Sequence, residues 1–396
     1  MNTSSILDVS CKTVCNLWQA SCGTVLVDVF HFLAGAIDAR DEVDCLFLDF
    51  RRAFDLVDHD LLFYKLSLLS LDRNVLAWLK DFLSERRQRV VLGGEKSEYV
   101  KVESGVPQGS VLGPLLFLIY INDIIYGIKS NIRLFADDCV IYRLINDFND
   151  INTLQSDLDK ISVWCKNWRM NLNVKKCVHV KFTKKKNPIT SVYMINNEII
   201  KLSSNVKYRG VMLSSDLAWT GHVEMIALSA IRMLNFVRRN FRQASKQIRE
   251  TLYLTYIRPC MEYASVVWDP HQNYLIDKLE KVQNQCARFV LNYYELGASV
   301  TNMKEALHWE KLSERRKLFR LKFLDDIYNN RFLINRNMFL QEPFYLSGRA
   351  DHPQKIRPYS CRTDTFAFSF FPKTIEEWNR LPKDVLMANL AFSSVV

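Results

Sequence analysis

The chain has 396 residues, of which 48% are hydrophobic and 24% are charged. This length and composition exclude a disordered tail and a disulfide-stabilised miniprotein, and they allow two or three domains. The 53 Lys and Arg residues outnumber the 43 Asp and Glu residues, which gives a formal net charge of +10. Such a balance favours a polyanionic partner without identifying it.

The positive charge is concentrated in one part of the chain. Residues 1–160 carry a net charge of −7, residues 161–258 carry +14 and residues 259–396 carry +3. A uniformly basic surface would not divide in this way. We therefore expect a polyanion to contact mainly the middle part.

The cysteines and the N-terminal segment indicate an intracellular protein. The ten cysteines are scattered and form no CxxC pair, so the sequence supports neither a disulfide scaffold nor a structural zinc site. The apolar stretch 23–37 has no basic segment before it and is interrupted by Asp28 and His31, which argues against a signal peptide and secretion.

The hydrophobic pattern predicts secondary structure along the whole chain. A buried strand at 43–50 ends in an acid, and an apolar stretch at 110–128 is interrupted by Pro114 and Asp123, which favours a buried helix over a membrane span. We expect helices at 58–70, 73–85, 151–168 and 223–241, strands around Gly93-Gly94 and at 177–182, 193–202 and 207–213, a hairpin at 132–144, a mostly helical remainder and an irregular section at 343–372.

Three acids lie at the ends of predicted strands. Asp49 ends the first strand, and Asp137 and Asp138 occupy the predicted hairpin turn. Adjacent carboxylates repel each other, so a bound divalent cation favours keeping them ionised together. The other adjacent pair, Asp325-Asp326, follows leucines at helical spacing and is explained by a solvated helix face.

Five segments carry a resemblance to a known family. LFLDFRRAFD (46–55), GVPQGSVLGP (105–114) and LFADDCVIY (134–142) resemble the first three palm motifs of reverse transcriptases, in the forms found in jockey-like non-LTR retrotransposons. NLNVKKCVHVKF (171–182) and VKYRGVML (206–213) are similar to the fourth motif and the primer-grip hairpin.

The resemblance implies an α+β fold, the palm of a right-hand polymerase. In this fold an antiparallel sheet packs on helices, with reduced fingers and a helical thumb. We expect a fingers remnant at 1–42, the palm at 43–213 with a fingers-side hairpin at 86–104, and the thumb with a C-terminal extension at 214–396. The segment before the first motif lacks the basic fingers motif of the family, so we expect an N-terminally truncated reading frame.

The same resemblance implies the catalytic residues. Asp49, Asp137 and Asp138 match the acids that bind two Mg²⁺ ions, for which Mn²⁺ can substitute. Lys176 matches the lysine that protonates or neutralises the departing pyrophosphate. The alternative for Lys176, which lies beside Lys175, is a solvated surface charge.

Four further residues match positions that contact the substrates. Phe54 matches the steric gate that excludes a ribose 2′-OH, or is simply a core aromatic. Gln108 and Gly109 match the motif that positions the incoming dNTP and the template, or form only a turn before a helix. Arg52 is a candidate contact for the triphosphate.

A basic cluster follows the primer-grip motif. Its candidate nucleic-acid contacts are Arg232, Arg238, Arg239, Arg242, Lys246 and Arg249. Here the RNA–DNA duplex leaving the site would present its phosphates, which basic side chains bind without reading sequence. A solvated helix face is the alternative for any single member.

The resemblance thus predicts an RNA-directed DNA polymerase that extends a DNA primer on an RNA template with dNTPs. The alternative is an inactive retrotransposon relic that only binds nucleic acid. A cyclase-like or scaffolding palm is disfavoured, because the PQG motif and primer-grip strand would have no purpose there. Integration on chromatin implies the nucleus, and we expect no membrane partner; the sequence predicts no oligomeric state.

Overall fold

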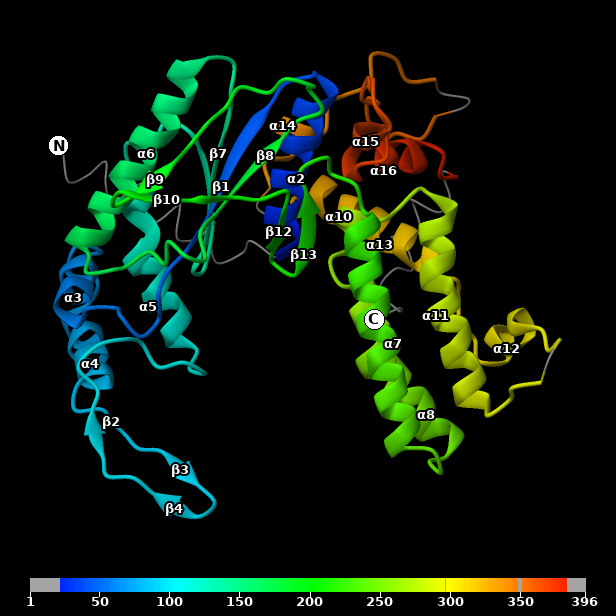
Figure 1. The fold of residues 1–396 in the computed structure, drawn as a ribbon, viewed down its shortest axis with the longest axis horizontal. Coiled ribbons are helices and arrows are strands. Elements are labelled where there is room, and N and C mark those ends of the chain that lie inside the picture. Colours follow the sequence, from blue (N-terminus) through cyan, green and yellow to red (C-terminus); the bar gives the residue numbers. More distant parts are fainter. Residues whose placement is uncertain (1–21, 296, 333, 348–350, 383–396) are drawn as a thin grey trace. The chain divides into compact units, whose positions relative to one another are not determined.

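A computed structural model describes residues 22–295, 297–332, 334–347 and 351–382 (Figure 1). The chain forms two compact units. The first, here called the sheet unit, contains residues 42–181 and 185–204. The second, the helical unit, contains residues 22–41, 182–184 and the described residues from 205 onward.

A five-stranded sheet with the order β11-β8-β1-β7-β6 forms the framework of the sheet unit. Its strands are β1 (Val43–Asp49), β6 (Asn131–Phe135), β7 (Asp138–Leu144), β8 (Val178–Phe182) and β11 (Lys201–Leu202). The apolar run of β1 is buried because strands flank it on both sides. Pairing is antiparallel for β1, β7 and β6, as predicted, whereas β11 runs parallel to β8, so the sheet is mixed.

Helices accompany this sheet, which confirms the predicted α+β class. They are α3 (His59–Ser67), α4 (Arg73–Leu83), α5 (Leu112–Ile121), the 3₁₀ turn η1 (Asn122–Ile125) and α6 (Phe148–Asn167). Asp58, Asp72 and Asp147 start α3, α4 and α6 by accepting hydrogen bonds from backbone N–H groups of the first turn.

The apolar helix α5 is shorter than the apolar stretch that predicts it. The regular helix ends at Ile121 and continues as η1, where polar Asn122 and Asp123 begin. Leu116, Phe117 and Tyr120 are buried in the core, so the predicted buried helix is confirmed. Across the described ranges, every helix is too short or too polar to span a bilayer.

Short hairpins complete the sheet unit. Strands β2 (Arg87–Gln88) and β5 (Val100–Lys101) pair, as do β3 (Val91–Leu92) and β4 (Glu95–Lys96), with the turn at Gly93-Gly94 (Figure 1). The predicted strand at 193–202 is instead divided into β9 (Met194–Ile195), β10 (Glu198–Ile199) and β11, because Asn196 and Asn197 adopt positive φ and form a turn.

The helical unit has one hairpin and many helices, as predicted. Helix α7 packs on α11, α13 packs on α16, and α2 packs on α10 and α15. Its elements are α2 (Cys22–Asp38), β12 (Asn205–Tyr208), β13 (Val211–Ser214), α7 (Thr220–Asn240), α8 (Lys246–Leu252), the π-helix η2 (Tyr253–Ile257), α9 (Arg258–Glu262), α10 (Ser265–Trp268), α11 (Asn273–Leu291), α12 (Val300–Ala306), α13 (Leu312–Tyr328), α14 (Arg336–Phe339), α15 (Asp364–Ala367) and α16 (Phe370–Asn379).

Two segments belong to the helical unit although the predicted domain bounds put them elsewhere. Helix α2, expected in a fingers remnant, belongs to the helical unit, where the Asp38 carboxylate accepts hydrogen bonds from the backbone N–H groups of Arg362 and Thr363 at 2.9 and 2.6 Å. The β12–β13 hairpin, expected in the palm, also packs in the helical unit. The functional labels fingers, palm and thumb remain predictions.

Candidate active site

The three predicted metal-binding acids come together at one end of two neighbouring strands. In the antiparallel register, Asp49 of β1 lies opposite Asp138 of β7. Asp137 lies in the turn between β6 and β7, beside Ala136, whose φ of 51° makes the turn tight. Asp137 and Asp138 are exposed and Asp49 is half-buried, so all three carboxylates lie at the edge of the sheet core.

A neighbouring segment fixes the backbone of Asp49. The Asn173 N–H donates to the Asp49 carbonyl at 2.8 Å, and the Arg51 N–H donates to the Asn171 carbonyl at 2.8 Å. The Asp49 N–H donates to the Cys177 Sγ at 3.5 Å. Burial raises the pKa of Cys177, so its thiol stays protonated at neutral pH and serves as a hydrogen-bond acceptor.

Lys176, from the same segment, approaches Asp49 with its side chain. The Lys176 Nζ lies 3.6 Å from the Asp49 Oδ2, and the lysine side chain is 68% exposed. This ion pair contributes little stability because water screens it. The structure thus brings Lys176 to the acids, while its role in pyrophosphate departure remains a prediction.

A cavity of about 520 Å³ opens at these acids. The side chains predicted to act on substrate come from four separate segments and all contribute to its wall. Its lining is Asp49, Phe50, Arg52, Ala53, Phe54, Gln108, Gly109, Pro114, Asp137 and Lys176. Asp138 is the one predicted acid outside this lining.

Phe54 is both a wall of the cavity and a packed aromatic. Its ring stacks on Phe117 of α5 with the centroids 4.4 Å apart and the planes 24° apart. Phe117 is completely buried, so it holds the Phe54 ring from behind. The two interpretations of Phe54 in the sequence are therefore compatible.

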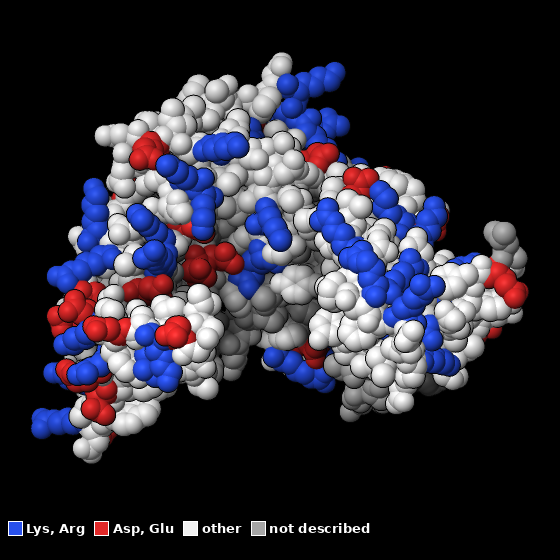
Figure 2. Space-filling view, turned by 60° about the horizontal axis from the view of Figure 1, so that its bottom comes forward, with Lys and Arg blue, Asp and Glu red and all other residues white. Residues whose placement is uncertain are grey.

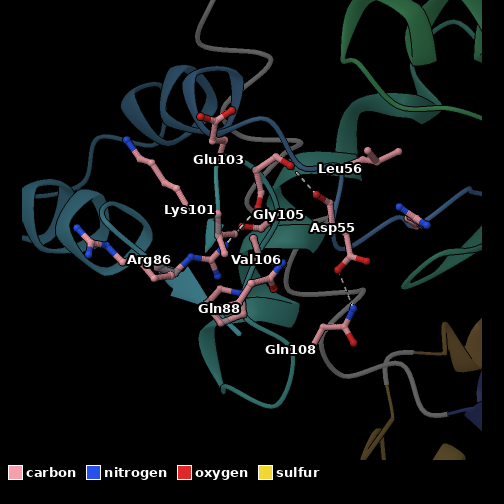
Figure 3. A pocket seen from close by; sticks show the side chains of 14 residues that line it. Asp55, Leu56, Arg86, Gln88, Lys101, Glu103, Gly105, Val106 and Gln108 are labelled. Carbon is pink, nitrogen blue, oxygen red and sulfur yellow. Dashed lines mark hydrogen bonds between the residues drawn. The ribbon is translucent and has the colours of Figure 1, made fainter. Parts of the chain in front are cut away.

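The loop that carries Gln108 is held against the segment after β1. The Gln108 Nε2 donates to the Asp55 Oδ1 at 3.0 Å, and Figure 3 shows the Asp55 carboxylate pointing toward the Gln108 amide. Gly105 has a φ of 82°, and a Cβ there would lie 2.8 Å from the Asp55 Cα, so the close approach of the two backbones requires glycine.

A second cavity, of about 750 Å³, is lined in part by this loop (Figure 3). It shares Arg52 and Gln108 with the first cavity. Arg86, in its wall, donates from Nη2 to the carbonyls of Ser104 and Gly105 at 3.2 and 2.9 Å, which further holds the loop. The remaining cationic side chains of its lining are Arg87 and Lys101.

Gly113, the second residue of α5 directly after this loop, is a residue whose importance sequence analysis missed. A Cβ on Gly113 would lie 2.3 Å from the Pro107 carbonyl oxygen, closer than atoms can approach. Ser110 closes the same turn, because its Oγ donates to the Pro107 carbonyl at 2.8 Å and accepts from the Gly113 N–H at 2.9 Å. The sequence signal for this turn is the small residues Ser110 and Gly113, which follow Pro107-Gln108-Gly109.

The acids suit a hard divalent cation. The Asp49 Oδ2 is buried and accepts no hydrogen bond from the described residues, because the Lys176 Nζ, 3.6 Å away, lies beyond hydrogen-bond distance. In the described part of the chain, no three His, Cys, Asp or Glu side chains are placed to hold a metal by themselves. Mg²⁺ commonly uses one or two carboxylates together with substrate phosphates, so this oxygen donor set fits it.

The basic residues predicted to contact nucleic acid divide into two groups. Arg232, Arg239, Arg242 and Lys246 are exposed on α7, on α8 and between them. Figure 2 shows Lys and Arg side chains gathered on a face of the helical unit. The remaining two are partly used in packing: Arg238 Nη2 donates to the Gln285 carbonyl at 3.1 Å and Arg249 Nη1 to the Phe289 carbonyl at 2.8 Å, both in α11.

Known proteins resemble this chain over most of its length. The X-element transposon product of Drosophila melanogaster, named a probable RNA-directed DNA polymerase, is 31% identical over 265 residues, covering 64% of this chain and 29% of the relative. The RNA-directed DNA polymerase of the mobile element jockey, from the same fly, is 27% identical over 272 residues, covering 66% and 30%. The chain thus spans about a third of the length of these relatives.

Among solved structures, apo telomerase from Candida tropicalis aligns with a TM-score of 0.40 and 9% identity over 83% of this chain and 54% of that one. Residues 10–213, which include the three acids and the lining of both cavities, match the family described as reverse transcriptase (RNA-dependent DNA polymerase). The chain belongs to the reverse transcriptase family, and within it is similar to the jockey-like non-LTR retrotransposons.

Proposed function

We propose that this chain catalyses RNA-directed DNA synthesis, in which the 3′-OH of a DNA primer attacks a dNTP paired to an RNA template. One observation carries the proposal. Residues of the four palm motifs, namely Asp49, Phe54, Gln108, Asp137 and Lys176, line a single cavity large enough for a nucleotide. The family and its transposon relatives support the same reaction.

The chain's own residues have distinct tasks in this reaction. Asp49, Asp137 and Asp138 would hold two Mg²⁺ or Mn²⁺ ions, which when bound supply charge stabilisation for the attacking and leaving oxygens. Lys176, whose Nζ lies 3.6 Å from the Asp49 Oδ2, would give a proton to the pyrophosphate leaving group. Phe54, backed by Phe117, excludes a ribose 2′-OH because its ring cannot move back into the core.

The exposed basic residues of α7 and α8 would bind the phosphates of the RNA–DNA duplex. Met233 and Phe236 are 37% and 51% exposed between them on α7, which gives this face apolar contact area as well as charge. Each phosphate contact releases a counterion, so duplex affinity falls as salt rises. We infer a nuclear protein, because integration of such elements takes place on chromatin.

Primer extension on a homopolymeric RNA template with Mg²⁺ or Mn²⁺ tests the activity. The D137N variant removes a cavity carboxylate, and D326N is its matched control, because Asp326 belongs to the other adjacent pair and forms an ion pair with Arg331 at 2.9 Å. Activity of the wild type and D326N with loss in D137N supports the proposal. Wild-type product no greater than that of D137N contradicts it.

The second candidate function, a relic that only binds nucleic acid, predicts duplex binding without primer extension. Filter binding across a salt series tests the binding that both candidates share. The double variant R239E/R242E should lower affinity for an RNA–DNA duplex and reduce the salt slope by about 2. K281E/K317E, two exposed positions of the same unit, is the control of equal charge change. Equal affinity and slope in the two variants would contradict the placement of the duplex.

A further inference from the structure

The β12–β13 hairpin ends in a turn that is costly for its sequence. Arg209 and Gly210 have φ values of 50° and 83°, so both adopt the left-handed conformation. Two-residue turns of this kind favour Asn-Gly or Gly-Gly, because a Cβ at the first position is strained. A contact from elsewhere in the chain must therefore favour this conformation at Arg209.

Tyr263 supplies that contact. Its hydroxyl donates a hydrogen bond to the Arg209 carbonyl at 3.1 Å. Its ring lies under Gly210, where an added Cβ would be 2.9 Å from the Tyr263 Cε1. The Tyr263 side chain thus contacts the turn twice, through its hydroxyl at the Arg209 carbonyl and through its ring at Gly210.

The backbone that presents Tyr263 is itself irregular. The π-helix η2 precedes Pro259, which has no N–H to continue the α-helical pattern, and Ala264 has a φ of 53°. At the end of α10, which follows Ala264, the Trp268 Nε1 donates to the Tyr263 carbonyl at 2.8 Å, and Trp268 is completely buried. A strained residue such as Ala264 persists where the surrounding structure fixes it. The hydrogen bond from the buried Trp268, here called the anchor, therefore sets the position of Tyr263.

The anchor continues into a buried ion cluster. Asp269, next to Trp268, lies 2.6 Å from the Arg316 Nε, 3.1 Å from the Arg320 Nε and 2.7 Å from the Lys373 Nζ. These contacts join α10 to α13 and α16. The backbone of Tyr263 is therefore connected, through Trp268 and Asp269, to α13 and α16.

We propose that Tyr263 is a positioning residue that clamps the turn of the β12–β13 hairpin, the segment that resembles a primer grip. Its effect on DNA synthesis rests on the proposed function, whereas the clamp itself does not. Without the ring and hydroxyl, Arg209 leaves the left-handed conformation and the turn moves. The primer 3′-OH is then aligned less often for attack, although Tyr263 touches no substrate.

Trypsin cleavage after Arg209, followed by mass spectrometry of the fragments, tests the clamp without any activity. Y263A should raise the cleavage rate at Arg209 about 10-fold or more and Y263F, which keeps the ring, about 3-fold, the range expected for one lost hydrogen bond. Y274F is the matched control, because the Tyr274 hydroxyl bonds Thr220 at 3.1 Å in the same unit. Cleavage of Y263A at the wild-type rate overturns the clamp.

Pre-steady-state nucleotide incorporation, with primer–template and dNTP in excess over enzyme, tests the consequence for synthesis. The burst amplitude measures the folded, active fraction, and the burst rate measures alignment. We expect unchanged amplitude in Y263F with a rate lowered about 3-fold, and a further loss of rate in Y263A. An unchanged rate, or a lower amplitude at an unchanged rate, overturns the positioning role. Wild-type protein without product contradicts the proposed function instead, and the trypsin result still decides the clamp.

Discussion

A buried carboxylate inside β1 provides a strong test of how the sheet unit holds its site. Asp44 is completely buried. Its Oδ1 lies 2.7 Å from the Lys181 Nζ and 3.1 Å from the His179 Nε2, and its Oδ2 accepts hydrogen bonds from Ser191 at 2.6 Å and Tyr193 at 2.8 Å. These partners join β1 to β8 and to the segment that follows β8.

The electrostatics of Asp44 set the size of the expected effect. Burial by itself would raise the pKa of Asp44, but His179 and Lys181 outweigh it and lower the pKa from 3.8 to about 2. A lowering of the pKa by roughly two pH units corresponds to a stabilisation on the order of 2 kcal/mol. Because the folded pKa is the lower one, this stabilisation is present above pH 3.8 and is lost as the pH falls from 3.8 toward 2.

At pH 7 the substitution D44N leaves Lys181 without its buried counterion. Breaking a buried pair in this way costs about 3 kcal/mol. We expect hydrogen–deuterium exchange of the β1 amides 44–48 to speed up by roughly 100-fold, since 1.4 kcal/mol corresponds to a factor of 10. D81N, which changes an exposed aspartate of α4, should alter this exchange by less than about threefold. An effect of D44N no larger than that of D81N would refute the reasoning.

Three further predictions concern other parts of the chain. Burial lowers the pKa of His222 from 6.5 to about 4. The unfolded chain therefore binds the proton more readily, and a stability on the order of 3 kcal/mol that is complete above pH 6.5 is lost as the pH falls toward 4. Exchange protection of α7 that does not change over this pH range would be inconsistent with this prediction. G113A, whose Cβ would meet the Pro107 carbonyl, should destabilise the folded protein by about 1–3 kcal/mol and lower primer extension. G221A, with no atom within 4 Å of the added Cβ, should do neither, and equal urea midpoints for the two variants would count against the clash. K176M should lower single-turnover incorporation by about 10²-fold or more while the exposed neighbour variant K175M should not, and similar rates for the two would remove Lys176 from the reaction.

Much of the sheet unit could be predicted because its signals are local. The apolar run of β1 has the length of a buried strand, and the spacing from Ile151 to Cys165 follows the helical period, which the structure confirms in β1 and α6. Asp49 and Asp137 are 88 positions apart, and the family resemblance rather than periodicity brought them together. The cross-strand register of β1 and β7 gives the physical reason.

The rest depends on contacts that no local pattern encodes. Cys177 reads as one more scattered cysteine until its Sγ is seen to accept the Asp49 N–H. Arg238 and Arg249 look like phosphate contacts, yet each donates to a carbonyl of α11 and so also serves packing. Helix α2 belongs to the helical unit because Asp38 binds backbone more than 320 positions away.

Template-directed incorporation of a single nucleotide tests the central claim most directly. A DNA primer annealed to a heteropolymeric RNA template is offered each dNTP separately, with wild type, D49N and the control D325N. Asp325 lies on α13 and forms an ion pair with Arg331. We predict that wild type and D325N add only the dNTP complementary to the next template base, and that D49N adds none. Addition without regard to the template, or equal addition by D49N, would contradict a reverse transcriptase site at Asp49.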